Sequence, residues 1–131
     1  MKKNIVFLIC ILAFILLITG CSKKGTNYKL QIKESSWSGW TQNYKPKEVV
    51  NKYNVTLGKE YNIDSGILIF KITKINNDSI IIETKDSFSD NENGVDLQSK
   101  KKKFKVSINK ELTLTTPTTD EGNTFYLKLV K

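Results

Sequence analysis

Two cysteines, Cys10 and Cys21, carry the most reactive side chains of this 131-residue chain. A thiol can act as a nucleophile activated by histidine, as a metal ligand beside other Cys or His side chains, as half of a disulfide, or as a site of acylation. The chain contains no His and no Arg, and all 21 basic residues are Lys. These residue types exclude a Ser–His or Cys–His pair and a Cys/His zinc site. We therefore predict a protein that is not an enzyme and has no cofactor and no metal.

The first 21 residues have the layout of an export signal. Two lysines precede an uncharged apolar run of 14 residues, Ile5 to Ile18. A helix that spans a bilayer needs about 20 residues, so this run is short for a permanent span. The string Leu17-Ile18-Thr19-Gly20-Cys21 resembles the lipobox of bacterial lipoprotein precursors, over residues 1–24. The resemblance implies cleavage between Gly20 and Cys21 and a diacylglycerol on the Cys21 sulfur, with palmitate-type acyl chains. An ordinary anchor helix with a chance cysteine is the alternative.

This interpretation divides the chain into three parts. Residues 1–20 are the lipoprotein signal peptide, residues 21–27 are the lipidated Cys and a polar tether, and residues 28–131 are one β domain. Removal of Cys10 with the signal leaves the mature chain without a disulfide. We expect the domain to be anchored by lipid on the extracytoplasmic face of the cell membrane, or on an outer membrane if the source has two.

Without Lys2 and Lys3, the mature chain has 19 lysines against 13 acids, a net charge of +6. The electrostatic field of a domain with this positive charge favours anionic partners. Outside the cytoplasmic membrane these are lipid headgroups, anionic wall polymers or acidic peptides, and we expect no nucleic acid partner there. The alternative is that the many Lys, Ile and Asn residues reflect an AT-rich genome.

Both tryptophans of the chain lie between Ser35 and Tyr44, among small polar residues and outside any clean alternation. Aromatic side chains on Ser/Gly-rich loops offer a large rigid surface at low entropic cost, as recognition surfaces do. We take Trp37, Trp40 and Tyr44 as the candidate binding residues. The alternative is that Trp37 or Trp40 covers an open end of the hydrophobic core, and we expect at least one of the two to be exposed.

An acidic stretch from Asp86 to Asp96 is followed by four lysines, Lys100 to Lys103. Its carboxylates and carbonyls could offer oxygen ligands to calcium, but the spacing differs from an EF-hand loop. The alternative is a solvated hairpin loop whose charge discourages pairing at the edge of the sheet. The sequence leaves both calcium binding and this alternative open.

The tetrapeptide Thr116-Pro117-Thr118-Thr119 is similar to the Pro-Thr-Thr-Gly loop of the chagasin-type cysteine-protease inhibitors, which are immunoglobulin-like sandwiches. Asp120 stands where that family has Gly, and the tetrapeptide precedes the last strand and not an early one. The similarity therefore transfers no functional residue. A strand-to-loop exit at Pro117 explains the same residues.

Strand residues dominate the mature chain, which contains no Ala. Apolar and polar residues alternate at 28–33, 103–108, 112–115 and 124–129, and the last three segments predict an antiparallel meander. Residues 67–84 predict a central hairpin that is buried on both faces near its middle and turns at Asn76-Asn77-Asp78. Gly58-Lys59 predicts a shorter hairpin, and Pro46 to Tyr53 a helix of one or two turns. The fold class is all-β, a single antiparallel β-sandwich of the immunoglobulin-like kind or a small barrel after the signal helix.

The sequence therefore predicts a membrane-anchored extracytoplasmic lipoprotein with a non-catalytic binding or accessory role in the bacterial cell envelope. Its partners would be the membrane, through the lipid, and an envelope protein, a peptide or an anionic polymer. One alternative is an inhibitor or immunity-type protein that antagonises an extracellular protease or peptide. Another is a structural subunit of an envelope complex.

Overall fold

The computed structural model describes residues 25–131, which form eight strands and one 3-10 helix. In chain order these are β1 (Gly25–Ser38), β2 (Glu48–Thr56), β3 (Glu60–Ile63), η1 (Asp64–Gly66), β4 (Leu68–Ile75), β5 (Ser79–Thr84), β6 (Lys103–Ser107), β7 (Leu112–Thr115) and β8 (Glu121–Val130). The predicted signal peptide and its cleavage site at Gly20 and Cys21 lie outside the described residues. β1 begins at Gly25, so it includes the last part of the predicted tether. Among these described elements, no helix has the length and apolar character that crossing a membrane requires.

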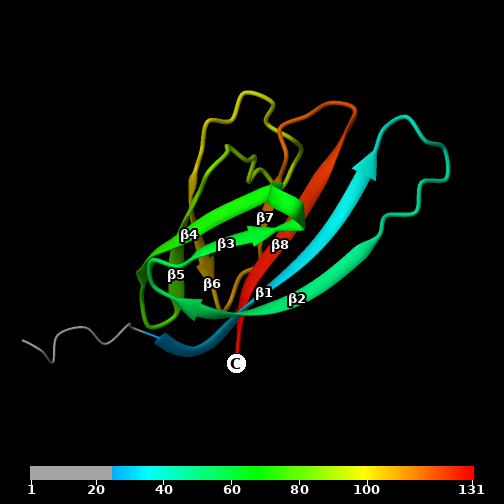
Figure 1. Cartoon of the computed structure of the whole chain (residues 1–131). Coiled ribbons are helices and arrows are strands. Elements are labelled where there is room, and N and C mark those ends of the chain that lie inside the picture. Colours follow the sequence, from blue (N-terminus) through cyan, green and yellow to red (C-terminus); the bar gives the residue numbers. More distant parts are fainter. Residues whose placement is uncertain (1–24) are drawn as a thin grey trace, which may run out of the picture.

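The strands form two four-stranded antiparallel sheets that pack face to face (Figure 1). The first sheet has the order β2-β1-β8-β7 and the second the order β3-β4-β5-β6. The predicted all-β sandwich is thereby confirmed. The strand order differs from the ABED and CFG sheets of immunoglobulin constant domains, so the likeness to that fold lies in the two-layer architecture.

Alternation of apolar and polar residues builds the core between the sheets. Leu30 and Ile32 of β1 face Phe70 and Ile72 of β4 across a layer of fully buried side chains. Two pairs of aromatic rings add volume, since Phe70 stacks on Tyr61 and Phe88 meets Phe125 edge to face. The remaining members of this core are Val55, Ile63, Leu68, Ile80, Ile82, Phe104, Val106, Leu114, Leu127 and Leu129. Burial on one face of each strand is therefore the main source of stability.

The helix predicted at Pro46 to Tyr53 is wrong, because most of this segment is strand β2. Val49, Val50 and Tyr53 can share a helix face, but β-branched and aromatic side chains are poor helix formers. Pairing with β1 from Ser35 to Lys29 supplies the backbone hydrogen bonds instead. Tertiary pairing overrides the local pattern here.

Of the predicted hairpins, the one that turns at Asn76-Asn77-Asp78 is confirmed as β4 and β5. It does not bury both faces, because Ile69 and Ile81 on its outer face are only half-buried. The turn at Gly58 joins β2 to β3, which lie in different sheets, so the predicted short hairpin is wrong. The predicted meander is correct for β7 and β8 only, since β6 pairs with β5 in the second sheet.

The two ends of the sandwich differ in what they carry (Figure 1). Gly25 and the C-terminal Lys131 lie at one end, because β1 and β8 are antiparallel neighbours with Lys29 opposite Val130. The long connections 39–47, 85–102 and 116–120 lie at the other end, beyond Ser38. We call this second end the loop end.

Candidate binding site at the loop end

The loop end is assembled by contacts between connections that are distant in sequence. The backbone N–H of Gly39 donates a hydrogen bond to the carbonyl oxygen of Asp120, at 2.6 Å. Ser89 and Thr115 exchange two backbone hydrogen bonds, which tie the 85–102 connection to the edge of β7. The Trp40 loop, the acidic loop and the Thr116–Asp120 loop therefore form one continuous surface.

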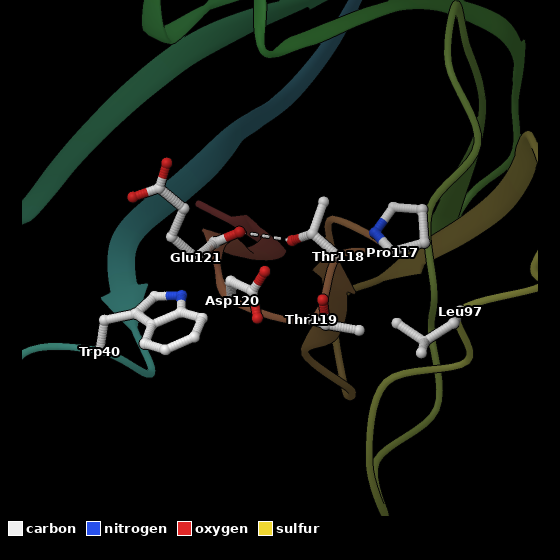
Figure 2. Close-up of a pocket in the computed structure, with 7 residues that line it drawn as sticks. All are labelled: Trp40, Leu97, Pro117, Thr118, Thr119, Asp120 and Glu121. Atoms are coloured by element: carbon white, nitrogen blue, oxygen red, sulfur yellow. Dashed lines mark hydrogen bonds between the residues drawn. The ribbon is translucent and has the colours of Figure 1, made fainter.

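Trp40 is the most exposed large apolar side chain of the described residues, with 77% of its surface accessible. It borders a hollow of about 620 Å³ whose other walls are Leu97 and the backbone and side chains of Pro117 to Glu121. Figure 2 shows Trp40 and Leu97 on opposite sides of Asp120 and Thr119. The hydroxyl of Thr118 donates to the carbonyl of Glu121 at 2.5 Å, which closes the turn between them. The exposed indole thus stands beside a shallow groove that is lined by both apolar and polar residues.

Trp37 differs from Trp40, because it belongs to the end of β1 and not to a loop. It lies opposite Gly122 of β8 on the outer face of the first sheet and is half-buried. Its indole Nε1 is buried and has no hydrogen-bond partner among the described residues. A buried donor without a partner costs about 1 to 3 kcal/mol, so the loop end carries a local penalty at this position.

Gly122 makes the close packing around Trp37 possible. A Cβ atom at this position would lie 2.2 Å from Oγ1 of Thr116, 2.7 Å from Oγ1 of Thr118 and 2.9 Å from Cζ2 of Trp37. Oγ1 of Thr116 is held in place because it accepts a hydrogen bond from the Asn123 N–H at 3.0 Å. The lack of a side chain at Gly122 therefore fixes how the last loop meets β1.

We expect Gly122→Ala to lower the free energy of unfolding by about 1 to 3 kcal/mol, as overpacking of a close contact does. Urea denaturation measures this change. Ser35→Ala is the control, because Ser35 lies on the same face of the β1–β8 strand pair. An unfolding midpoint equal to the control's would show that the threonine hydroxyls move aside at no cost.

Tyr44 is 40% exposed and returns from the loop toward β1. Its hydroxyl forms a hydrogen bond of 2.5 Å with the hydroxyl of Ser36. Together with Trp37, Ile67 and Gly122, Tyr44 lines a second hollow at this end, of about 450 Å³. All three sequence-predicted binding residues, Trp37, Trp40 and Tyr44, are therefore at the loop end, with Trp40 and Tyr44 exposed.

Beneath this second hollow, two carboxyl groups lie close together. Glu34 sits opposite Phe125 at the inner face of the first sheet, and Asp64 follows β3 with a left-handed backbone φ of 50°. Asn123 donates its Nδ2 hydrogen to Asp64 at 2.8 Å. Burial, a side-chain hydrogen bond to Asp64 and the negative charge of Asp64 raise the pKa of Glu34 to about 7, while Lys47 opposes the shift. Burial, and then the charge of Glu34, also raise the pKa of Tyr53.

The raised pKa of Glu34 predicts a pH dependence of stability. Its pKa is about 7 in the folded chain against an ordinary value of 4.5, so the folded state retains the proton more strongly between these values. Folding stability therefore falls as the pH rises from about 4.5 to 7. We expect Glu34→Gln to remove this fall and to stabilise the chain above pH 7 by about 1 kcal/mol, after allowance for solvent screening. Denaturation curves across this range test the result, with Glu111→Gln as the control; parallel pH profiles for all three proteins would contradict it.

The acidic loop uses its carboxylates within the chain. Asp90 pairs with Lys101, and Glu92 pairs with Lys110 at 3.0 Å. The Asp96 carboxylate accepts a hydrogen bond from the backbone of Gln98 at 3.0 Å. Among the described residues, no three acidic, His or Cys side chains are grouped as a metal site would require.

Charge is unevenly distributed over the molecule. Three hollows lie at the loop end, lined by Trp40 and Leu97, by Trp37 and Tyr44, and by Trp37 and Val95 with their neighbours. None of the residues that line these hollows is a lysine, although the chain has 21. Three carboxylates do line them: Glu92, Asp120 and Glu121. Lysines do occur in the loops of this end, at Lys45, Lys47 and Lys100 to Lys102, but they line none of the three hollows.

Sequence reasoning missed several residues of this end. Leu97, half of its surface exposed, and Pro117 lie across from Trp40 only because the acidic loop and the last loop converge. Glu34 and Asp64 meet across the interior between the sheets, and neither has a local sequence signal. The exposed apolar residue Leu97 within an acidic segment is the one signal that could have indicated a contact surface.

The chain matches no protein-family model, no curated protein and no solved structure. Its function is therefore inferred from its own residues.

Proposed function

We propose that this protein is an extracytoplasmic lipoprotein whose β-sandwich binds a peptide or protein segment at its loop end without catalysis. The observation that carries the proposal is the exposed Trp40 beside the groove formed by Leu97 and Pro117 to Glu121. Tryptophan is enriched among residues that dominate binding energy, and the exposed apolar side chains of Trp40 and Leu97 on either side of a groove are typical of an interaction site.

The fold suits this function if Cys21 carries the lipid. β1 starts at Gly25, close to Cys21, and runs 14 residues to Ser38, which is about 45 Å for an extended strand. Figure 1 shows that β1 runs from the end that holds Gly25 to the loop end. With a lipid on Cys21, the start of this strand would lie near the membrane. The loop end is then the membrane-distal end, where a soluble or surface-bound partner has access.

The residues of the groove indicate the chemistry of the partner. Asp120 and Glu121 stand beside the indole of Trp40, and no lysine lines the groove. A positively charged side chain placed there interacts with both the carboxylates and the face of an aromatic ring. The favoured partner segment therefore combines apolar and cationic side chains, while the lysine-rich remainder of the domain suits anionic headgroups or polymers nearby.

Replacing Trp40 with Ala tests the proposed function. We expect binding of a synthetic peptide rich in Leu and Lys to fall by about tenfold or more, as for a central interface tryptophan, while the free energy of unfolding changes by less than about 0.5 kcal/mol. Binding is measured by calorimetry on the processed chain, with a peptide in which Glu replaces each Lys as the probe of charge. Leu57→Ala is the matched control, since Leu57 is exposed at the opposite end.

Two outcomes would count against the proposal. Unchanged peptide binding by the Trp40→Ala variant would remove Trp40 from the interface. A loss of several kcal/mol in stability would assign its indole to the packing of the loops instead.

A second candidate function is inhibition of an extracellular protease or antagonism of a peptide. The observation that favours it is the convergence of the Trp40 loop and the Thr116–Asp120 loop at one end, joined by the Gly39–Asp120 hydrogen bond. Inhibitors commonly present preorganised loops from one end of a rigid scaffold. Inhibition assays against serine and cysteine proteases distinguish the two functions, because inhibition requires blocked catalysis and not peptide binding alone.

A further inference from the structure

One edge of the first sheet is left open along β2. The opposite edge, at β7, is closed at its last residue by the backbone hydrogen bonds of Ser89 with Thr115. β2 is the outer strand on its side of the first sheet (Figure 1). All residues from Glu48 to Lys52 are exposed, Val50 to 53%. An open, regular edge with exposed valines is a surface on which another strand can pair.

Tyr61 of β3 shows which backbone groups of β2 face this edge. Its hydroxyl accepts a hydrogen bond from the Thr56 N–H at 3.1 Å and donates one to the Asn54 carbonyl at 2.5 Å. Residues two apart in a strand direct their N–H and C=O groups to the same side. Glu48, Val50 and Lys52 therefore direct theirs to the free edge, beyond the part of β2 that Tyr61 closes.

A second copy of this strand is complementary to that edge in one register. Antiparallel pairing centred on Val50 places Val50 opposite the partner's Val50 and Glu48 opposite the partner's Lys52. Each of these pairs exchanges two backbone hydrogen bonds, since all three residues point outward. Their side chains lie on one face, so the opposite charges meet directly. Lys33, whose Nζ is 3.5 Å from Glu48, lies on the same face and joins this charge pair.

The neighbouring registers are poorer. Centring the pair on Val49 places Lys52 opposite the partner's Pro46, which has no N–H to donate. Centring it on Asn51 places Glu48 opposite the partner's Asn54, whose carbonyl is already bound by Tyr61. The sequence of β2 therefore selects one arrangement of two chains.

We infer that two copies of this chain associate through β2 in antiparallel register about Val50, which joins their first sheets into one eight-stranded sheet. This inference rests on strand geometry and does not depend on the ligand proposed for the loop end. The paired segment is short, so the association is weak. Because the pairing is antiparallel, it turns the two copies end for end and joins copies whose β1 strands are not both held upright on one membrane surface.

Cysteine crosslinking of the full chain in detergent solution, where no membrane fixes the orientation of either copy, tests the register. In the inferred dimer, two Val50→Cys residues have Cα atoms about 5.5 Å apart, which a disulfide can bridge. Glu48→Cys alone lies about 13 Å from its own copy, but a mixture of Glu48→Cys and Lys52→Cys chains can crosslink. Thr73→Cys, exposed on the inner strand β4, and the unsubstituted chain with Cys10 and Cys21 are the controls. We expect about tenfold more covalent dimer from Val50→Cys than from either control.

Charge exchange supplies a second, independent measurement. Glu48→Lys and Lys52→Glu should each reduce the Val50→Cys crosslink severalfold, and the chain with both changes should recover it. Glu83→Lys, exposed on β5, controls for net charge. The inference is overturned if Val50→Cys gives no excess of dimer in correctly folded chains, if the double exchange fails to restore it, or if the crosslinked partner is another protein. Loss of peptide binding in the Trp40→Ala variant, with an unchanged Val50→Cys crosslink, would not contradict the inferred dimer.

Discussion

Replacing Phe70 with Ala is expected to lower the free energy of unfolding by about 3 to 5 kcal/mol, the range for removing a buried phenylalanine. Phe70 is 1% exposed and its ring stacks on Tyr61 with the centroids 5.0 Å apart. The cavity left by the substitution lies in the layer between the two sheets, where neighbouring strands cannot close it without breaking their pairing. Urea denaturation of the processed chain measures the effect.

Ile81→Ala is the matched control, because Ile81 lies on the outer face of the adjacent strand β5 and is half-buried. We expect the control to cost less than half as much as Phe70→Ala. A drop of under about 1 kcal/mol for Phe70→Ala, with an unchanged dependence on urea, would mean that the site collapses around the missing ring. That outcome would contradict the tight packing of Phe70 against Tyr61.

The effect of Phe70 reaches beyond the core, because Tyr61 has two roles. One face of its ring stacks on Phe70, and its hydroxyl closes the edge of β2 at Asn54 and Thr56. A single side chain of the second sheet thus holds the edge strand of the first sheet. Tyr61→Phe would keep the stacking and lose the edge bonds, so comparison with Phe70→Ala separates packing from edge closure.

Strand alternation allowed most of the fold to be predicted, because a sandwich buries one face of each strand. Tyr28, Leu30 and Ile32 show this alternation at the start of the domain, and Phe125, Leu127 and Leu129 show it at the end. The same logic failed for β2, whose residues Glu48 to Lys52 extend past the second sheet and are exposed on both faces. A strand without a buried face has no alternation to read, and its pairing with β1 is decided by long-range contacts.

The sequence indicated which residue types form the candidate site, but it did not indicate how the loops that carry them come together. Aromatic residues on a Ser/Gly-rich segment predicted that at least one of Trp37 and Trp40 is exposed, and Trp40 is. Trp37 is the exception, since β1 continues to Ser38 and places its indole over Gly122. Contacts between distant segments, such as the hydrogen bond between Gly39 and Asp120, cannot be predicted from the local sequence. They depend on the sheet order, which alternation alone does not determine.

Replacing Cys21 with Ala is expected to abolish incorporation of labelled fatty acid and to move the protein out of the membrane fraction, or to leave it unprocessed. The reason is the lipobox-like string that ends at Cys21, whose sulfur would receive the diacylglycerol in the proposed lipoprotein. Loss of all acyl chains removes the stable anchor, since about 0.8 kcal/mol per buried methylene is lost. Metabolic labelling and membrane fractionation measure the change.

Cys10→Ala is the matched control, because Cys10 lies within the segment that the cleavage would remove. It should keep both the label and the membrane location. Persistent fatty-acid incorporation in Cys21→Ala would contradict the lipoprotein assignment, and equal loss in Cys10→Ala would point to a general failure of export. A processed Cys21→Ala chain, once released, should still bind the Leu- and Lys-rich peptide, because Trp40 lies about 45 Å from Gly25 along β1. Anchoring and recognition are then separable functions at the two ends of one strand.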